Sequence, residues 1–576
     1  MTNLRLLTFV CVDGTLPALS GLEQLDSVEL FSCSAFGIEG LRGSGIMHFG
    51  YNGDPIDLSP LNDCPALSIV DLQLNLTDAA DLSGFHPPAL NDLTIRNIGQ
   101  TFPRVDLSGL RQCTALNQLI LDSVDIDNLQ FIENCTELQS LYLHSLNLKR
   151  LDGVENLKEL RYLELMNVSN LADISAIEGC TALETFSVWG YPQNVTVSDL
   201  SALGKLPHLG YVSNTGALNT DLNFLKEMPT KEDIIFIFED SGVTDYSGFA
   251  AMKSYHWLCI NMNGKNVAPA VRYLKDTPIK TLRLTSATNT DLSISSHVKQ
   301  ELILENCDIQ DLATLSDSTN FELLTIEVCS SVQSLNGIEK NKAFGTLKKG
   351  TAKGSLYIDN CPHLIDFSAL EGLYLSEFKL VDMNVLPDFS AFAAETYCLK
   401  GFPEMTDLSC FDGLDLSRSY SFDVSGLEGL RDISALSHLK GKKLIVRPEL
   451  KEQAQELVAS GNFETYEIMY PGSSWHADDS EFKLLSLDEL YAQPKSVLAR
   501  VRSFCLAGDH LFDESKYRIE EEGDALYLCR YDSDERIPIE PGTRLTDLSA
   551  LKNLTGLKRL KLYAQPLHST YPIFRR

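Results

Sequence analysis

Long apolar runs are missing from this sequence. No stretch of about 18 uncharged apolar residues, the length that a membrane-spanning helix needs, occurs among its 576 residues. The first twenty residues hold only a short apolar run that Asp13 ends, which does not match a secretory signal peptide. The sequence therefore predicts a cytoplasmic protein with no membrane partner, and secretion as an effector stays an open alternative.

Basic residues are also scarce. The chain has 48 lysine and arginine residues against 79 aspartate and glutamate residues, so its formal net charge at pH 7 is −31. Such a chain repels nucleic-acid backbones and anionic membranes, and we expect neither as a partner. A basic protein partner is compatible with this charge, although an acidic surface can also serve solubility alone.

Enzyme motifs are absent as well. The sequence holds no G-x-S-x-G, no phosphate-binding Gly-Lys-Ser/Thr loop, no H-E-x-x-H and no protein-kinase motif set. Its 14 cysteines form no C-x-x-C pair, which argues against a metal site. We therefore predict no enzyme, no cofactor and no bound metal. The competing signal is a Cys/His pairing that His476, Cys505 and His510 would allow.

A regular spacing of leucines dominates the chain. Apolar residues stand at Leu107, Leu110, Cys113, Leu116, Leu119, Leu121, Val124 and Ile126, and the spacing returns over 129–148 and 154–168. An amphipathic helix would alternate steps of three and four, and a strand would hold steps of two. A mixed spacing that repeats about every 20–29 residues is the leucine-rich-repeat signature. It predicts an α/β repeat fold, a leucine-rich-repeat solenoid of horseshoe form with a parallel sheet on its concave face.

A second pattern, Asp-Leu/Ile/Phe-Ser, marks the phase of the repeats. It begins at Asp57, Asp81, Asp106, Asp173, Asp199, Asp366, Asp388, Asp407, Asp432 and Asp547. An aspartate there can accept a hydrogen bond from the N–H two residues on, and so cap a short helical or 3₁₀ turn. These Asp–Ser pairs are thus predicted to be structural and not catalytic.

Cysteines fall at fixed places in the repeat. Cys64, Cys113, Cys135 and Cys180 take the place of a leucine, and Cys33, Cys307, Cys329 and Cys361 follow the expected strand. This usage predicts buried, reduced, structural thiols.

The pattern divides the chain into three predicted parts. Residues 1–445 form the solenoid with an atypical N-terminal cap, residues 446–542 an α+β insert or C-terminal cap, and residues 543–576 a further repeat unit and a tail. Within the second part we expect a helix over 448–460, a strand over 463–470 and a hairpin of 517–519 with 526–530. One repeat cannot bury its own face, so the last unit should stack on the main array or on the preceding segment.

The spacing L-x-x-L-x-x-L-x-L with Asp-Leu-Ser-x-Leu resembles the leucine-rich repeats of the internalin and phosphatase-regulator type. The resemblance covers roughly residues 15–445 and again 543–563, in repeats of about 22 residues. It implies a binding fold whose function lies on variable exposed positions. The chain departs from the internalins because only Asn75 and Asn263 clearly hold the asparagine position and no signal peptide is read, so a surface-adhesin role is not expected.

Exposed strand positions are the predicted binding residues. Side chains alternate along a strand, so residues beside the two inward leucines point out of the concave face. The aromatic candidates are Tyr142, Tyr162, Trp189, Tyr211, Phe236 and Trp257, and the acidic candidates are Glu301, Glu305, Glu327 and Asp359. Exposed aromatics mark interfaces, and carboxylates attract a basic partner. A one-residue slip in register would bury Phe236 and Trp257.

These observations predict a scaffold that captures a basic protein partner on its concave face. One alternative makes the array the substrate-recognition arm of an enzyme or effector whose activity lies in 463–542. Another makes it an inhibitor or immunity protein against a basic toxin. A lysine-rich segment at 340–354 is either a solvated excursion or a local docking site. The sequence does not indicate an oligomeric state.

Overall fold

A computed structural model describes most of the chain. It covers 4–469 except 11–13, 17, 20, 33–36, 191–196, 216–220, 230, 241, 289–291, 403–410, 412 and 428, and beyond 469 it gives the strands within 485–563. The chain forms two compact units. Unit 1 comprises Met1–Phe186, Gln193–Ala202 and Asp479–Arg576, and unit 2 comprises Ser187–Pro192 and Leu203–Asp478.

Unit 1 is built on parallel strands that follow one another in chain order. These are β1 (Leu6–Val10), β2 (Ser27–Phe31), β3 (His48–Gly53), β4 (Ile69–Leu74), β6 (Asp92–Asn97), β8 (Gln118–Asp122), β9 (Ser140–His144) and β10 (Tyr162–Met166). Each pairs with the next without a slip, so that Leu93, Leu119, Leu141 and Leu163 form one column. Short strands β5 (Ala80–Asp81) and β7 (Val105–Asp106) pair separately, and β11 (Thr185–Trp189) crosses into unit 2.

Unit 2 continues the same plan. Its strands are β12 (Tyr211–Thr215), β13 (Ile234–Glu239), β14 (Tyr255–Asn261), β15 (Ile279–Thr285), β16 (Val298–Glu305), β17 (Leu323–Glu327), β18 (Gly345–Thr346), β19 (Ser355–Asp359), β20 (Leu373–Val381), β21 (Ala393–Lys400), β22 (Ser421–Gly426), β23 (Gly441–Val446) and β24 (Phe463–Ile468). Its α-helices are α1 (Phe224–Glu227), α2 (Ala268–Val271) and α3 (Lys451–Ala459). The last helix and β24 confirm the helix and strand predicted there.

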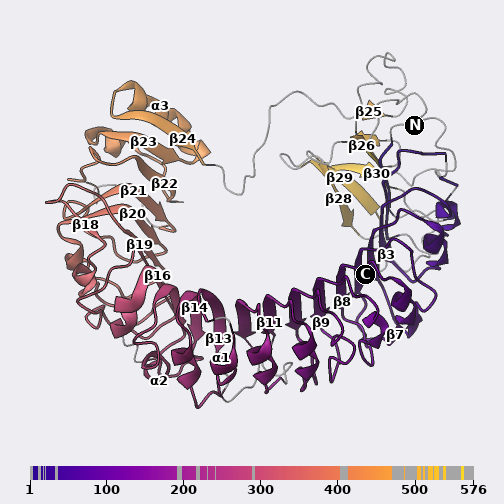
Figure 1. Cartoon of the computed structure of the whole chain (residues 1–576). Coiled ribbons are helices and arrows are strands. Elements are labelled where there is room, and N and C mark those ends of the chain that lie inside the picture. The colour runs from indigo at the N-terminus through magenta and orange to yellow at the C-terminus, as the bar shows by residue number, and fades with distance from the viewer. Residues whose placement is uncertain are drawn as a thin grey trace. The chain divides into compact units, whose positions relative to one another are not determined.

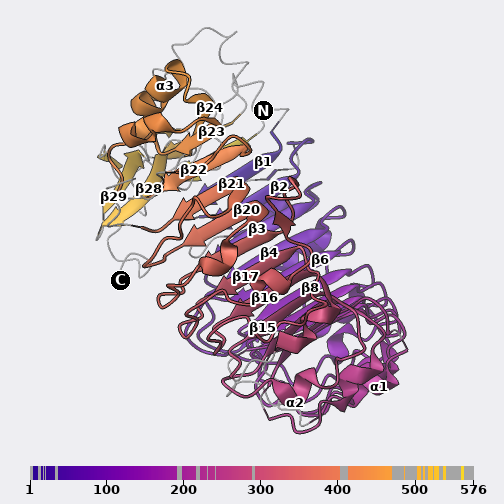
Figure 2. The ribbon, with the colours of Figure 1, turned by 90° about the vertical axis from the view of Figure 1, so that its left-hand side faces the viewer.

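Within each unit the strands line one side of the ribbon, and turns and short helices lie on the other (Figure 1). The main strands of the repeats lie side by side and run in one direction (Figure 2). The core fills the space between these two sides. All eight apolar residues of the repeat at 107–126 are buried, because two strand leucines and the residues of the return path meet there. The chain therefore has the leucine-rich-repeat fold that its spacing predicts, a solenoid with a parallel sheet.

Aspartates cap the return turns at eight of the ten predicted positions, and the other two, Asp407 and Asp547, lie outside the described residues. In η3 (Ser108–Gln112), the Ser108 N–H donates to Asp106 Oδ1 at 2.9 Å. The same bond, at 2.8 to 2.9 Å, recurs from the serine two residues on at Asp57, Asp81, Asp173, Asp199, Asp366, Asp388 and Asp432. Backbone and hydroxyl bonds from the serine hold the pKa of Asp57 and of Asp432 below the usual value.

A left-handed residue turns the chain away from the sheet after many strands. Ser145, Asn167, Asn306 and Asn360 each follow a strand with φ between 46° and 52°. Serine and asparagine tolerate this region better than most residues. Val328 takes the same place after β17 with φ 54°. A β-branched side chain is strained there, so this position is a weak point of its repeat.

The described cysteines of the predicted set are buried, as predicted, and Cys33 lies outside the described residues. Each buried thiol of this set reaches back to a carbonyl of the preceding repeat, as Cys135 does to Leu110 at 3.5 Å and Cys180 to Val154 at 3.3 Å. Burial raises the pKa of both thiols to about 12. Among the described cysteines none forms a disulfide.

The described strand of the C-terminal repeat pairs with the first strand of the array. Strand β31 (Arg559–Tyr563) pairs in parallel with β1 on one side and with β26 (Ser503–Ala507) on the other. The remaining strands are β25 (Leu485–Ser486) and β27 (His510–Phe512), and an antiparallel sheet of β28 (Tyr517–Glu522), β29 (Ala525–Arg530) and β30 (Arg536–Ile539). The predicted hairpin is confirmed. In the described part of the chain, no helix has the length and apolar character of a membrane span.

Candidate functional site

On many of the described strands one face is buried and the other is accessible. The accessible face, called here the open face, carries the side chains that alternate with the buried leucines. On β9 these are Ser140, Tyr142 and His144, while Leu141 and Leu143 are buried. The open face is where the predicted binding residues should lie.

The open face of unit 1 carries two of the predicted aromatics. Tyr142 is half-buried, and 43% of Tyr162 is exposed. Tyr142 meets the edge of His144 at 6.3 Å between ring centroids, and His144 Nε2 lies 2.8 Å from Glu164 Oε1. Ion pairing continues to Arg96, whose Nε lies 3.0 Å from Asp122 Oδ2. This face is therefore largely polar and paired across its own strands.

The open face of unit 2 holds an apolar strip. In the strand register Tyr211 aligns with Ile235, and Ile235 with Trp257. The next column aligns Ile237 with Cys259. The apolar strip comprises Tyr211, Ile235, Ile237, Trp257 and Cys259. Trp257 is 38% exposed and the other four side chains are half-buried, so this patch of β12 to β14 contacts solvent.

Trp189 lies at the end of β11 and is 40% exposed. It belongs to unit 2, as do Tyr211 and Trp257, whereas Tyr142 and Tyr162 belong to unit 1. The predicted aromatics are thus exposed or half-buried at five of six positions.

The prediction that Phe236 is exposed is wrong. Phe236 is fully buried, with its ring centroid 6.0 Å from those of Phe224 and Phe249. Ile234 and Phe238 are buried with it, and the register shifts between Ile234 and Ile235. Because the run Ile-Ile-Phe-Ile-Phe is apolar at every position, no alternation in it fixes which face is buried. The sequence prediction missed Ile235 and Ile237 as residues of the open face. The larger volume of the two phenylalanines was the available signal that they fill the core instead.

Four carboxylates form an acidic strip on the same sheet, which β15 separates from the apolar strip. Glu301, Glu305, Glu327 and Asp359 all lie half-buried on the open face of β16, β17 and β19, where the sequence places them. Glu305, Glu327 and Asp359 stand side by side in one column.

One arginine neutralises part of this strip. Arg283 donates from Nε at 3.0 Å and Nη2 at 2.7 Å to Glu305 Oε2, and its Nη2 lies 3.8 Å from Glu327. Thr285 donates to the same Glu305 oxygen at 3.0 Å. Glu305 is therefore satisfied internally, and the remaining carboxylates carry the excess negative charge.

Two carboxylates of the acidic strip, Glu301 and Asp359, have a raised pKa. Burial raises the pKa of Glu301, with Glu327 acting in the same sense and Arg283 against it. Burial likewise raises the pKa of Asp359, helped by the negative charge of Asp382. A cation placed beside these groups would favour their charged form. The strip is thus suited to accept hydrogen bonds from a guanidinium or ammonium group.

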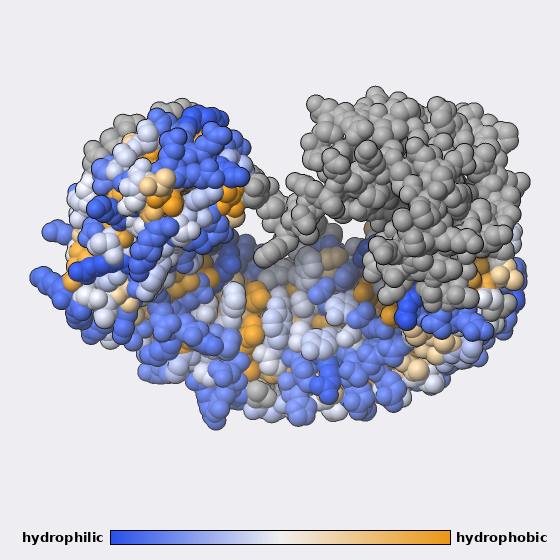
Figure 3. Space-filling view, turned by 90° about the horizontal axis from the view of Figure 1, so that it is seen from above, coloured by the Kyte–Doolittle hydropathy of each residue, from blue (hydrophilic) through white to orange (hydrophobic). Residues whose placement is uncertain are grey.

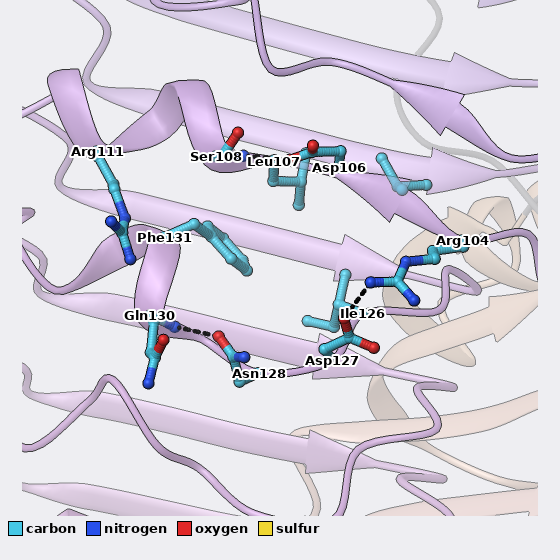
Figure 4. Close-up of a pocket in the computed structure, with 11 residues that line it drawn as sticks. Arg104, Asp106, Leu107, Ser108, Arg111, Ile126, Asp127, Asn128, Gln130 and Phe131 are labelled. Carbon is cyan, nitrogen blue, oxygen red and sulfur yellow. Dashed lines mark hydrogen bonds and ion pairs between the residues drawn. The ribbon is translucent and has the colours of Figure 1, made fainter.

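In the space-filling view, apolar patches stand among hydrophilic residues on the surface that faces the viewer (Figure 3). A separate hollow of about 210 Å³ lies in unit 1 between the return turns of two repeats. Arg104 and Asp127 form an ion pair at one end, and the Gln130 N–H donates to Asn128 at 2.9 Å (Figure 4). These contacts lie within and between the return turns of the two repeats, so the hollow follows from how the repeats stack.

The predicted Cys/His alternative concerns His476, Cys505 and His510, whose side chains lie outside the described residues. Among the residues that are described, no group of three or more His, Cys, Asp or Glu is placed to hold a metal ion.

No protein-family model matches the chain, and no curated protein does. Similar solved structures include an internalin of Listeria monocytogenes, 19% identical over 55% of this chain and 86% of its own, with a TM-score of 0.36. A leucine-rich-repeat protein of Leptospira interrogans is 14% identical over 78% and 92%, with a TM-score of 0.38. The functional domain of the Listeria monocytogenes protein InlJ, which includes a cysteine ladder, is 17% identical over 57% and 70%, with a TM-score of 0.35. The leucine-rich-repeat assignment follows from the chain's own strand register and buried columns.

Proposed function

We propose that this chain is a scaffold that binds a protein partner on the open face of unit 2, and that the partner is basic and partly apolar. The observation that carries the proposal is the apolar strip on β12 to β14 and the acidic strip on β16 to β19, on the same face of one sheet.

The apolar strip would supply most of the affinity. Tyr and Trp are enriched among residues whose truncation costs binding energy. Tyr211 and Trp257 lie on the two strands that flank Ile235, and each is aligned with it. An exposed apolar patch rimmed by polar residues on a soluble chain is typical of an interface.

The acidic strip would supply attraction and selectivity. Glu327 and Asp359 stand side by side on neighbouring strands, and Glu301 lies at the start of the paired segment of β16. Arg283 is committed to Glu305. Complementary charge speeds encounter and disfavours acidic competitors. Arginine or lysine side chains of the partner would also relieve the raised pKa values of Glu301 and Asp359.

A pull-down from source cells with the full chain as bait tests the apolar strip. The variant carries Trp189→Ser, Tyr211→Ser and Trp257→Ser, and its control carries Ile98→Ser, Phe102→Ser and Ile365→Ser, three exposed apolar residues outside the strands. We expect a basic protein bound by the wild type and the control but lost from the variant. Equal recovery by all three would place the interface elsewhere.

Two triple variants with the same change in net charge test whether the acidic strip takes part in binding the same partner. Glu301→Gln, Glu327→Gln and Asp359→Asn should slow association and flatten its dependence on salt. The control Glu23→Gln, Glu137→Gln and Asp276→Asn changes the net charge equally at exposed sites outside the strands. If both variants lose affinity equally, only the net charge matters and the strip has no specific role.

A further inference from the structure

An inserted hairpin interrupts the regular repeats of unit 2. Aligned positions lie 22 residues apart from Glu301 to Leu323 and from Ser355 to Glu377, but 32 apart from Leu323 to Ser355. The extra residues include β18, which pairs antiparallel with the start of β20 (Figure 1). Insertions that a rigid scaffold holds in place are common carriers of function.

The hairpin is anchored and not merely appended. The Leu347 N–H donates to Gly372 at 2.9 Å, and the Lys353 N–H donates to Tyr374 at 3.1 Å. Phe344 is buried at its base. The backbone is therefore fixed against β20, while the side chains at the tip are free to meet a ligand.

The hairpin concentrates positive charge in an acidic chain. Residues 340–354 contain five lysines and no aspartate or glutamate. Lys348, Lys349 and Lys353 are exposed, and within the described part of the chain no ion pair or side-chain hydrogen bond holds them. Elsewhere many lysines and arginines lie within reach of a carboxylate, as Lys253 does at 2.8 Å from Glu232.

The positive charge continues along the edge of the neighbouring strands. Arg418 lies over the ring of Tyr374 at 5.6 Å, and Lys442 lies over the ring of Tyr420 at 4.4 Å. Tyr420 is 57% exposed. Arg418 lies just before β22, and Lys442 is the second residue of β23. Both therefore lie where strands begin, as does the part of β20 with which the hairpin pairs. The basic edge comprises Lys348, Lys349, Lys353, Arg418 and Lys442.

We propose that the basic edge docks an acidic, extended peptide segment of a protein partner. Lysine and arginine bind carboxylates through charge-assisted hydrogen bonds. The edge spans β20 to β23, three strand spacings or about 15 Å, which suits a few extended residues. It is separate in residues and in charge from the open face, so it stands whether or not the open face binds a basic partner.

A peptide fits this edge better than a nucleic acid does. Two carboxylates lie close to these cations. Glu371 precedes Gly372, which holds the hairpin, and Glu395 accepts a hydrogen bond at its carbonyl from the Tyr420 N–H at 2.6 Å. A nucleic-acid strand carries a charge about every 3.4 Å and would meet these carboxylates. A peptide can present its acids at intervals that avoid them.

Fluorescence anisotropy with the full chain tests the proposal. The probe is a labelled peptide of alternating glutamate and serine, compared with a glutamine and serine peptide and with polyuridylate. Lys348→Ser, Lys349→Ser and Lys353→Ser should weaken binding of the glutamate peptide by at least about tenfold. The control Lys149→Ser, Lys275→Ser and Lys299→Ser makes the same change in net charge at exposed sites elsewhere, and should bind as the wild type does.

Arg418→Gln with Lys442→Gln should also weaken binding of the glutamate peptide, because all five cations of the basic edge contribute to it. The Trp257→Ser change should leave it unaltered, which separates this site from the open face. No binding by the wild type, equal binding of the glutamine peptide, an unaltered hairpin variant, or tighter binding of polyuridylate would each overturn the proposal.

Discussion

Phe236 and Trp257 show how one position in a strand decides the role of an aromatic residue. They lie on adjacent strands, yet Phe236 is fully buried and Trp257 is 38% exposed. Phe236 packs among Phe224, Phe238 and Phe249 at centroid distances near 6 Å. The first residue thus holds the core together, and the second is available to a ligand.

Truncation should separate the two roles. Phe236→Ala removes core packing and should lower the free energy of unfolding by about 3–5 kcal/mol. Trp257→Ala should lower it by less than about 1 kcal/mol, since much of the ring already contacts water. Urea unfolding of both variants measures the difference. Similar losses would mean that the two side chains are equally buried in solution.

Val328 offers a test of backbone strain. Its φ of 54° suits asparagine, which stands at the equivalent turns at Asn306 and Asn360. Val328→Asn should therefore raise the free energy of unfolding by about 1 kcal/mol. Asn306→Val should lower it by a similar amount. Denaturant midpoints measure both, and a destabilised Val328→Asn would show that the valine side chain contributes more by packing than its backbone loses.

The return turn is the next level, and its aspartate cap couples stability to pH. Hydrogen bonds from the following serine lower the pKa of Asp57, Asp173, Asp366 and Asp432 below 3.8, the usual value. A group whose pKa is lowered by folding stabilises the fold above its unfolded pKa. That contribution is lost as the pH falls through the folded pKa, so acid should weaken many turns together.

Asparagine at these four caps should remove part of this dependence. It keeps the bond to the serine N–H but does not titrate. We expect the quadruple variant to melt below the wild type at pH 7, where the aspartates are charged. Near pH 3 the difference in Tm should shrink, because the wild-type caps are then partly protonated. A difference that stays constant between the two pH values would contradict this role of the caps.

The repeat pattern could be predicted from the sequence because its causes are local. Leucines at fixed steps, Asp–Ser caps and buried cysteines such as Cys135 each follow from one repeat and recur in the next. The site was predictable only where a strand alternates. On β14 and β16 the alternation placed Trp257 and Glu301 correctly, whereas the uniformly apolar β13 gave no such guide and Phe236 was misplaced.

Contacts between distant segments could not be predicted in the same way. The pairing of β31 with β1 joins residues 559–563 to residues 6–10. Neither segment contains a sequence feature that indicates which strand it pairs with. The cation–aromatic contact of Lys442 with Tyr420 likewise depends on strand register. The sequence showed a lysine-rich segment at 340–354 but not the edge that it extends.

At the scale of the molecule, the first strand of unit 1 is not an edge. Strand β31 covers β1, whose Leu7 and Phe9 are buried, and β26 covers β31 in turn. In a repeat protein, stability comes from the interfaces between neighbours. Strand β31 therefore covers the first strand of the N-terminal repeats.

Deleting residues 543–576 should expose this end. Hydrogen exchange should speed up in β1 and β2, because β1 then has an unpaired edge. Strand β23 of unit 2 serves as the internal reference and should exchange as before. Unchanged protection of β1 in the truncated chain would show that β31 does not contribute to the stability of that end.

The proposed partner of the open face of unit 2 is a basic protein. Site-specific photo-crosslinking tests this proposal most directly, with a benzophenone amino acid at position 257 on the apolar strip or at position 365 outside the strands. We expect a covalent adduct with one basic protein from position 257 only, and we expect it to be lost when Glu301, Glu327 and Asp359 are neutralised. An adduct with the same protein from position 365 alone, or none from position 257, would contradict it.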